Sequence, residues 1–226
     1  MRPALAMPLG GFLVCAVAAI AAQPAPTMPP GITRTVLVDN RTVMMARLGM
    51  APGAQEEVHT HPFSAVVVQI GDGDVDMRLG SAHTRGRRPH GFVDFIPREL
   101  PHAAGNAGTA PFDVVTIAIK PDRTPGGEAP ASAAPEGITR TLGLDNAEAR
   151  VTLVGFAVGA REPIHTHPFD LVVVQLTPGR VEVRLGDEVT MKEHAAGDVL
   201  FLPRDVPHAV SNIGGAPFEV LSVGIK

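Results

Sequence analysis

Histidines at repeated spacings are the residues of this 226-residue sequence best suited to chemistry. In two places an H-x-H pair begins a predicted strand, and a third histidine follows a Pro-containing turn further along the chain. Residues two apart on a strand point to the same face, so each pair and its third histidine can converge on one point. Three converging imidazoles form a facial ligand set for a divalent metal ion. The predicted ligands are His59, His61 and His102 in the first set, and His165, His167 and His208 in the second.

An alternative applies to each of these histidines taken singly. A lone buried histidine more often forms hydrogen bonds within a core than binds a metal. Three histidines per set, repeated in register, instead favour metal ligation. The other histidines, His83, His90 and His194, have no partner at the repeat offset and are predicted not to be ligands.

The elements that must position these sets belong to an internal repeat. The pentapeptide GITRT at 31–35 recurs at 137–141, and HTHPF at 59–63 recurs at 165–169, both with an offset of 106 residues. About half of the aligned positions are identical, and no insertion breaks the register. We therefore predict a first domain over 31–120, a linker over 121–135 and a second domain over 136–226.

Each unit consists of short strand-like runs between turns. Residues 66–70 and 172–176 are rich in valine, and residues 181–185 alternate between apolar and polar side chains. The chain also contains 24 glycines and 22 prolines, which punctuate it at short intervals. This pattern predicts an all-β fold of the sandwich or barrel kind.

The histidines and their neighbours resemble the two motifs of the cupin superfamily. In the first unit Gly53 precedes His59-x-His61 by six positions, and Gly91, Pro97, His102 and Asn106 follow at the second motif's spacing. The second unit repeats both motifs from Gly159 to Asn212. The resemblance implies two tandem jelly-roll β-barrels related by a pseudo-twofold axis, a bicupin, with one divalent Fe, Mn, Ni, Zn or Cu ion per barrel.

One position departs from the family pattern. The first motif usually carries a glutamate ligand three or four residues after its second histidine, and here Ala65, Val66, Leu171 and Val172 stand there. Asp170 is the nearest carboxylate in the second unit, either as a ligand or as a residue that orients one, and the alternative is a solvent-facing loop residue. Three neutral imidazoles leave the metal charge uncompensated, which favours an anionic or bidentate oxygen ligand.

Other residues could complete the site. Gln69 and Gln175 are identical residues in apolar strands and could hydrogen-bond a substrate, or could be buried amides paired with the backbone. Phe63 and Phe169 follow each H-x-H pair and could form a pocket wall or simply pack in the core.

The first residues indicate export. Arg2, an apolar run and the small-residue site around Ala19 and Ala21 have the order of a cleaved signal peptide, predicted over residues 1–22. An uncleaved membrane anchor is the alternative, but the apolar run is short for a span. We therefore expect a secreted or periplasmic protein without a stable membrane span after cleavage.

Two functions remain open at this stage. The first is a metal-dependent oxygenase, because three-histidine sites in cupins resemble those of thiol, gentisate and diketone dioxygenases, and its substrate would be a small chelating organic acid or enol. The second is a non-catalytic periplasmic protein that binds metal or a small anion. The net charge of −4 argues against nucleic acid as a partner, so a small-molecule ligand is expected, and a homo-oligomer is compatible with the sequence.

Overall fold

The computed structural model describes residues 28–127 and 134–226, and the export signal predicted over 1–22 lies outside them. Within these two ranges the chain forms sixteen strands and no helix. No helix there has the length and apolar character that a bilayer span requires. The strands of the first half are β1 (Ile32–Asp39), β2 (Val43–Met50), β3 (Ser64–Ile70), β4 (Gly73–Leu79), β5 (Ala82–Arg88), β6 (Val93–Ile96), β7 (His102–Asn106) and β8 (Phe112–Ile119). Those of the second half are β9 (Ile138–Asp145), β10 (Ala149–Phe156), β11 (Asp170–Gln175), β12 (Gly179–Leu185), β13 (Glu188–His194), β14 (Val199–Leu202), β15 (His208–Asn212) and β16 (Phe218–Ile225).

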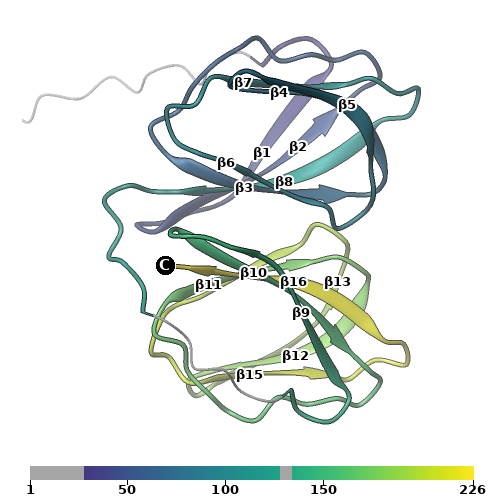
Figure 1. Cartoon of the computed structure of the whole chain (residues 1–226). Helices are drawn as coiled ribbons and strands as arrows, with labels where there is room; N and C mark the ends of the chain where they lie inside the picture. Colours follow the sequence, from purple (N-terminus) through teal and green to yellow (C-terminus); the bar gives the residue numbers. More distant parts are fainter. Residues whose placement is uncertain (1–27, 128–133) are drawn as a thin grey trace, which may run out of the picture.

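Each half folds into a barrel built from one five-stranded and one three-stranded sheet (Figure 1). In the first barrel the sheet orders are β1-β2-β8-β3-β6 and β5-β4-β7. The second barrel has the corresponding orders β9-β10-β16-β11-β14 and β13-β12-β15. The predicted fold class, all-β with two tandem barrels related by the repeat, is confirmed.

The five-stranded sheets of the two barrels face each other across the middle of the molecule (Figure 1). Their outer faces share one hydrophobic cluster, so each of these sheets is covered on both sides. This explains the valine run of β3, in which every residue except Val67 is buried. The fully buried members of the cluster are Val43, Met45, Val66, Val68, Val115 and Ile117 from the first barrel, and Ala149, Val151, Val172, Val174, Val223 and Ile225 from the second.

The motif glycines have the backbone conformation that glycine tolerates best. Gly53 and Gly159 have φ angles of 75° and 76°, and Gly91 and Gly197 have φ angles of 77° and 86°. These angles lie in the left-handed region, which side chains other than glycine rarely adopt. The glycines therefore allow the tight turns that lead into the H-x-H segment and into β6 or β14.

Candidate metal centres

The third histidine of each set is paired with the first through the backbone. His59 and His102 exchange two N–H···O hydrogen bonds of 2.9 Å, and His165 and His208 do the same at 3.0 and 2.9 Å. The H-x-H pairs thus lie in short bridges to β7 and β15, ahead of β3 and β11, whereas the sequence predicted that they begin those strands. The bridge places the first and third side chains next to each other.

A left-handed turn residue fixes the second histidine of each pair. Glu99 and Asp205 both have a φ angle of 58° in the turn before the third histidine. Their N–H groups donate hydrogen bonds of 2.8 Å to the carbonyls of His61 and His167. The turn of the second motif therefore holds the loop of the first motif in place.

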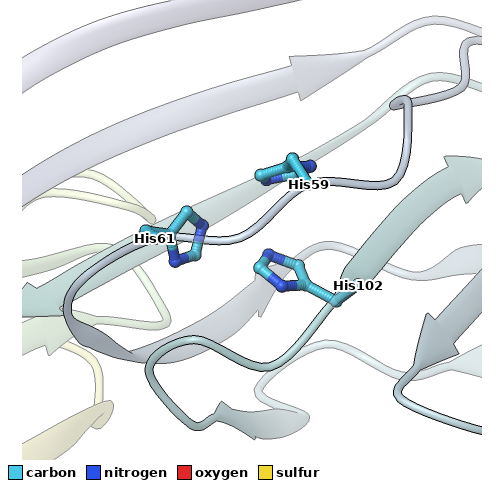
Figure 2. Close-up of side chains that lie close together, drawn as sticks. All are labelled: His59, His61 and His102. Carbon is cyan, nitrogen blue, oxygen red and sulfur yellow. The ribbon is translucent and has the colours of Figure 1, made fainter.

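The six histidines form two compact groups. Figure 2 shows the rings of His59, His61 and His102 gathered between the loop of the first motif and the start of β7. Their centroids lie 4.4 to 5.2 Å apart, and those of the second group lie 4.5 to 5.1 Å apart. Within each group one nitrogen from every ring lies within 4.8 Å of the others. The structure thus brings together both sets of predicted ligands.

Backbone carbonyls fix the tautomer of four of these rings. Nδ1 lies 2.8 to 3.0 Å from a carbonyl oxygen in each case, and because a carbonyl only accepts hydrogen bonds, Nδ1 carries the proton. The lone pair on Nε2 is then free for a metal, as in most histidine metal sites. The four donor and acceptor pairs are His59 to the Glu57 carbonyl, His102 to Leu100, His165 to Pro163 and His208 to Val206.

Burial favours the neutral form of three of these six rings by lowering their pKa. It lowers the pKa of His61 and of His167 to about 4, with further lowering by the neighbouring histidines. Burial also lowers the pKa of His208. A metal competes with protons for the imidazole lone pair, so neutral rings are ready to bind.

The residues present fit a divalent metal ion. Nε2 of His165 and Nε2 of His167 lie 3.2 Å apart, close to the roughly 3.3 Å between two nitrogens that share a tetrahedral ion at about 2.0–2.1 Å. In the first group Nδ1 of His61 is buried and has no hydrogen-bond partner among the described residues. Imidazole nitrogen suits Zn, Cu, Fe and Ni. Within residues 28–127 and 134–226 neither group includes a carboxylate.

The second group opens into a cavity of about 600 Å³ inside its barrel. All three histidines of that group contribute to its wall, which is otherwise mainly valine, leucine and phenylalanine side chains. Arg140 and Glu162 also line it and form an ion pair of 3.2 Å. Neither residue was predicted from the sequence, although Arg34 and Glu56 stand at the corresponding positions of the first repeat.

The phenylalanines and glutamines predicted to complete the sites differ in their contacts with the histidines and the cavity. Phe63 stacks on His61 at 4.5 Å and Phe169 stacks on His167 at 5.1 Å, and Phe169 also lines the cavity. Gln175 lines the cavity too, with its amide donating to the carbonyl of Thr177 at 2.7 Å. Gln69 is buried, and its Nε2 has no hydrogen-bond partner in the described part of the chain.

Asp170 does not belong to the second group. Its carboxylate accepts hydrogen bonds from the Thr42 hydroxyl at 2.6 Å and from the Arg204 N–H at 2.9 Å, and the residue is buried at the interface between barrels. Alternation along β11 explains this, because Phe169 and Leu171 line the cavity and Asp170 points the other way. The expectation of a ligand-orienting role, and the alternative of a solvent-facing loop residue, are both corrected by this placement.

Comparison with known proteins agrees with the motifs. Residues 152–224 match the cupin domain family model. The structure resembles AerE from Microcystis aeruginosa, with a TM-score of 0.73 and 14% identity over 87% of this chain and 93% of that chain. It also resembles oxalate decarboxylase from Bacillus subtilis, with a TM-score of 0.66 and 16% identity over 85% of this chain and 72% of that chain. A third similar structure is salicylate 1,2-dioxygenase from Pseudoaminobacter salicylatoxidans, with a TM-score of 0.65 and 13% identity over 81% of this chain and 71% of that chain.

No curated protein matches the sequence. The family match covers the second repeat, and the first repeat has the same motifs, strand order and histidine group. The second repeat therefore matches the cupin domain family, and the chain has the fold of two tandem cupin barrels with a three-histidine group in each.

Proposed function

We propose that this chain is an exported, metal-dependent oxygenase that acts on a small chelating organic acid or enol. The observation that carries the proposal is the second histidine group, in which three imidazoles face a cavity of about 600 Å³ without a carboxylate ligand among the described residues. Such a donor set leaves the charge of a divalent ion to be balanced by the substrate.

A bound divalent ion would supply Lewis-acid chemistry and, if it is redox-active, chemistry with O₂. The protein's own contribution is to hold and enclose the reactants. Backbone carbonyls orient His165 and His208, and stacking against Phe169 orients His167. Apolar side chains make up most of the cavity wall, and a surrounding of low polarity strengthens electrostatic interactions at the metal group.

Two of the structural neighbours are enzymes named for small organic acids. Their names refer to oxalate and to salicylate, and the Bacillus subtilis oxalate decarboxylase contains Mn(II) centres. These likenesses lie under 25% identity and show the fold alone, so the substrate class rests on the donor set and the cavity.

Export and partners belong to the same proposal. The N-terminal pattern of charge, apolar run and small residues supports a secreted or periplasmic location. A small-molecule ligand is the proposed partner, because the near-neutral charge offers no broad basic field for nucleic acid.

A non-catalytic role in metal or small-anion binding is the second candidate, and the first barrel favours it. A cavity of about 420 Å³ in that barrel is lined by residues of β4, β5 and β6 and by Phe92, and by none of the three histidines. A metal held there would not face that cavity. One chain could thus combine a metal-holding barrel with a reactive one.

Oxygen uptake by the full-length mature protein tests the proposal. The protein is loaded with Fe(II), and O₂ consumption is followed with salicylate, gentisate and oxalate as probes. We expect uptake with at least one chelating acid, its loss in His208→Ala, and its retention in the control His83→Ala, because His83 is exposed and pairs with Asp76. If the protein binds metal but consumes no O₂ with any of the three acids, the oxygenase proposal is overturned and the metal-binding or anion-binding role remains.

A further inference from the structure

The two barrels differ at two positions that line their cavities. Leu200 on β14 lines the cavity of the second barrel, and Asp94 on β6 is its counterpart in the first. Likewise His194 at the end of β13 corresponds to Arg88 at the end of β5. Both pairs lie at the gap between the two sheets of their barrel.

In the first barrel this gap contains a shielded ion pair. Arg88 and Asp94 form a salt bridge with only 14% and 25% of their side chains exposed. The Arg88 guanidinium also lies 4.6 Å from the ring centroid of Phe92. All three side chains line the smaller cavity, which does not include a histidine of the first group.

In the second barrel the same positions are part of one continuous cavity. His194, Asp198 and Leu200 line it together with His165, His167 and His208, and His194 contacts Asp198 at 3.2 Å. The wall between these ends is apolar, with Val154, Leu171, Val183 and Phe218 among its members. A volume of about 600 Å³ falls within the roughly 300–1,000 Å³ typical of small-molecule sites.

We infer that the second barrel alone holds the substrate site, and that its ligand is an organic anion whose anionic head reaches the three-histidine group while an apolar body fills the cavity. The inference rests on the proposed function for the metal at the head-group end. Asp94 places a carboxylate in the first barrel where Leu200 presents an apolar side chain in the second, and an apolar ligand body cannot replace the water and charge partners of that carboxylate.

Chain-length dependence of alkanoate binding tests this. Butanoate, hexanoate and octanoate are titrated into the Zn(II)-loaded full-length protein by calorimetry. We expect one site per chain, with affinity rising about threefold to fourfold per added methylene. Two equal sites, or affinity independent of length, would overturn the inference.

Reciprocal exchange of the two residue pairs locates the site. The variant His194→Arg/Leu200→Asp brings the ion pair into the second barrel and should weaken octanoate binding more than tenfold. The reverse exchange Arg88→His/Asp94→Leu should leave the affinity of the original site within twofold. Equal weakening by both exchanges would contradict the assignment to the second barrel.

A second pair of variants keeps the test valid if the variant His194→Arg/Leu200→Asp fails to fold. Val210 lines the cavity two residues after His208, and Ala104 is its counterpart. Val210→Phe should weaken octanoate more than butanoate, and Ala104→Phe should weaken neither. Metal content is measured in every protein: failure of the wild type to bind Zn(II) contradicts the proposed function, whereas bound Zn(II) with length-independent binding contradicts only this inference.

Discussion

The Thr42 hydroxyl donates a hydrogen bond of 2.6 Å to Asp170 across the interface between the two barrels. The pseudo-symmetric positions carry the reverse arrangement, since Ser64 donates to Glu148 at 2.8 Å. Each contact thus joins one hydroxyl and one carboxylate, with the carboxylate on β11 in the first contact and in the turn before β10 in the second. Asp170 and Ser64 also accept the N–H groups of Arg204 and Arg98.

Replacing Asp170 by alanine should destabilise the protein without removing metal. The change leaves the buried Thr42 hydroxyl without its acceptor, which costs about 1–3 kcal/mol of unfolding free energy. Urea denaturation measures the loss, and elemental analysis measures the metal. A fall in metal content of the folded variant would show that Asp170 acts on the metal site after all.

Alanine at the third histidine should remove metal from one barrel at a time. His102 and His208 are 3% and 2% exposed, so each change removes a buried ligand and leaves two. We expect wild type to bind two equivalents of Zn(II), each single variant about one, and the double variant close to none. His83→Ala is the matched control, and two equivalents in the double variant would contradict the ligand assignment.

The metal-free protein should lose stability as the pH falls from about 6.5 to about 4. Burial lowers the pKa of His61 and His167 to about 4, so the unfolded chain binds more protons than the folded one between these values. The contribution is therefore fully present above about pH 6.5 and is lost as the pH falls through the folded pKa. Thermal melting across this range measures it.

A variant separates this effect from general acid unfolding. His61→Phe with His167→Phe removes both titrating groups, and its melting temperature should depend less on pH between about 4 and 6.5. An unchanged pH dependence in this variant would assign the loss of stability to other groups.

The two barrels should unfold in one cooperative transition. Ile117 from the first barrel and Val223 from the second are fully buried in the same hydrophobic cluster. Ile117→Ala should cost about 2–5 kcal/mol and lower the stability of both barrels together. Calorimetry would show equal calorimetric and van't Hoff enthalpies, whereas two separate transitions would contradict the shared core. Val189→Ala, at a position that is 41% exposed, is the control.

The predicted fold and histidine groups depended on patterns that are local or exactly repeated. The H-x-H pairs, the motif glycines and the valine runs each lie within a few residues, and the 106-residue offset doubles every one of them. Local spacing determines which side chains share a face, so convergence of His59 and His61 could be predicted before the third ligand was placed. Arg140 and Glu162 carried the same repeat signal and were missed because their pairing depends on how the barrel closes.

Other features depended on contacts between residues far apart in the chain. Asp170 pairs with Thr42 over a separation of 128 residues, which no local pattern indicates. The contrast between Leu200 and Asp94 became meaningful only when the structure showed which of them lines a cavity that reaches a histidine group. By itself the sequence determined the repeat, the all-β class and the six histidines, because these depend on residue type and short-range periodicity. Only the tertiary structure decided which carboxylates stay away from the metal groups and which barrel has room for a ligand, because burial and cavity shape arise from packing across the whole chain.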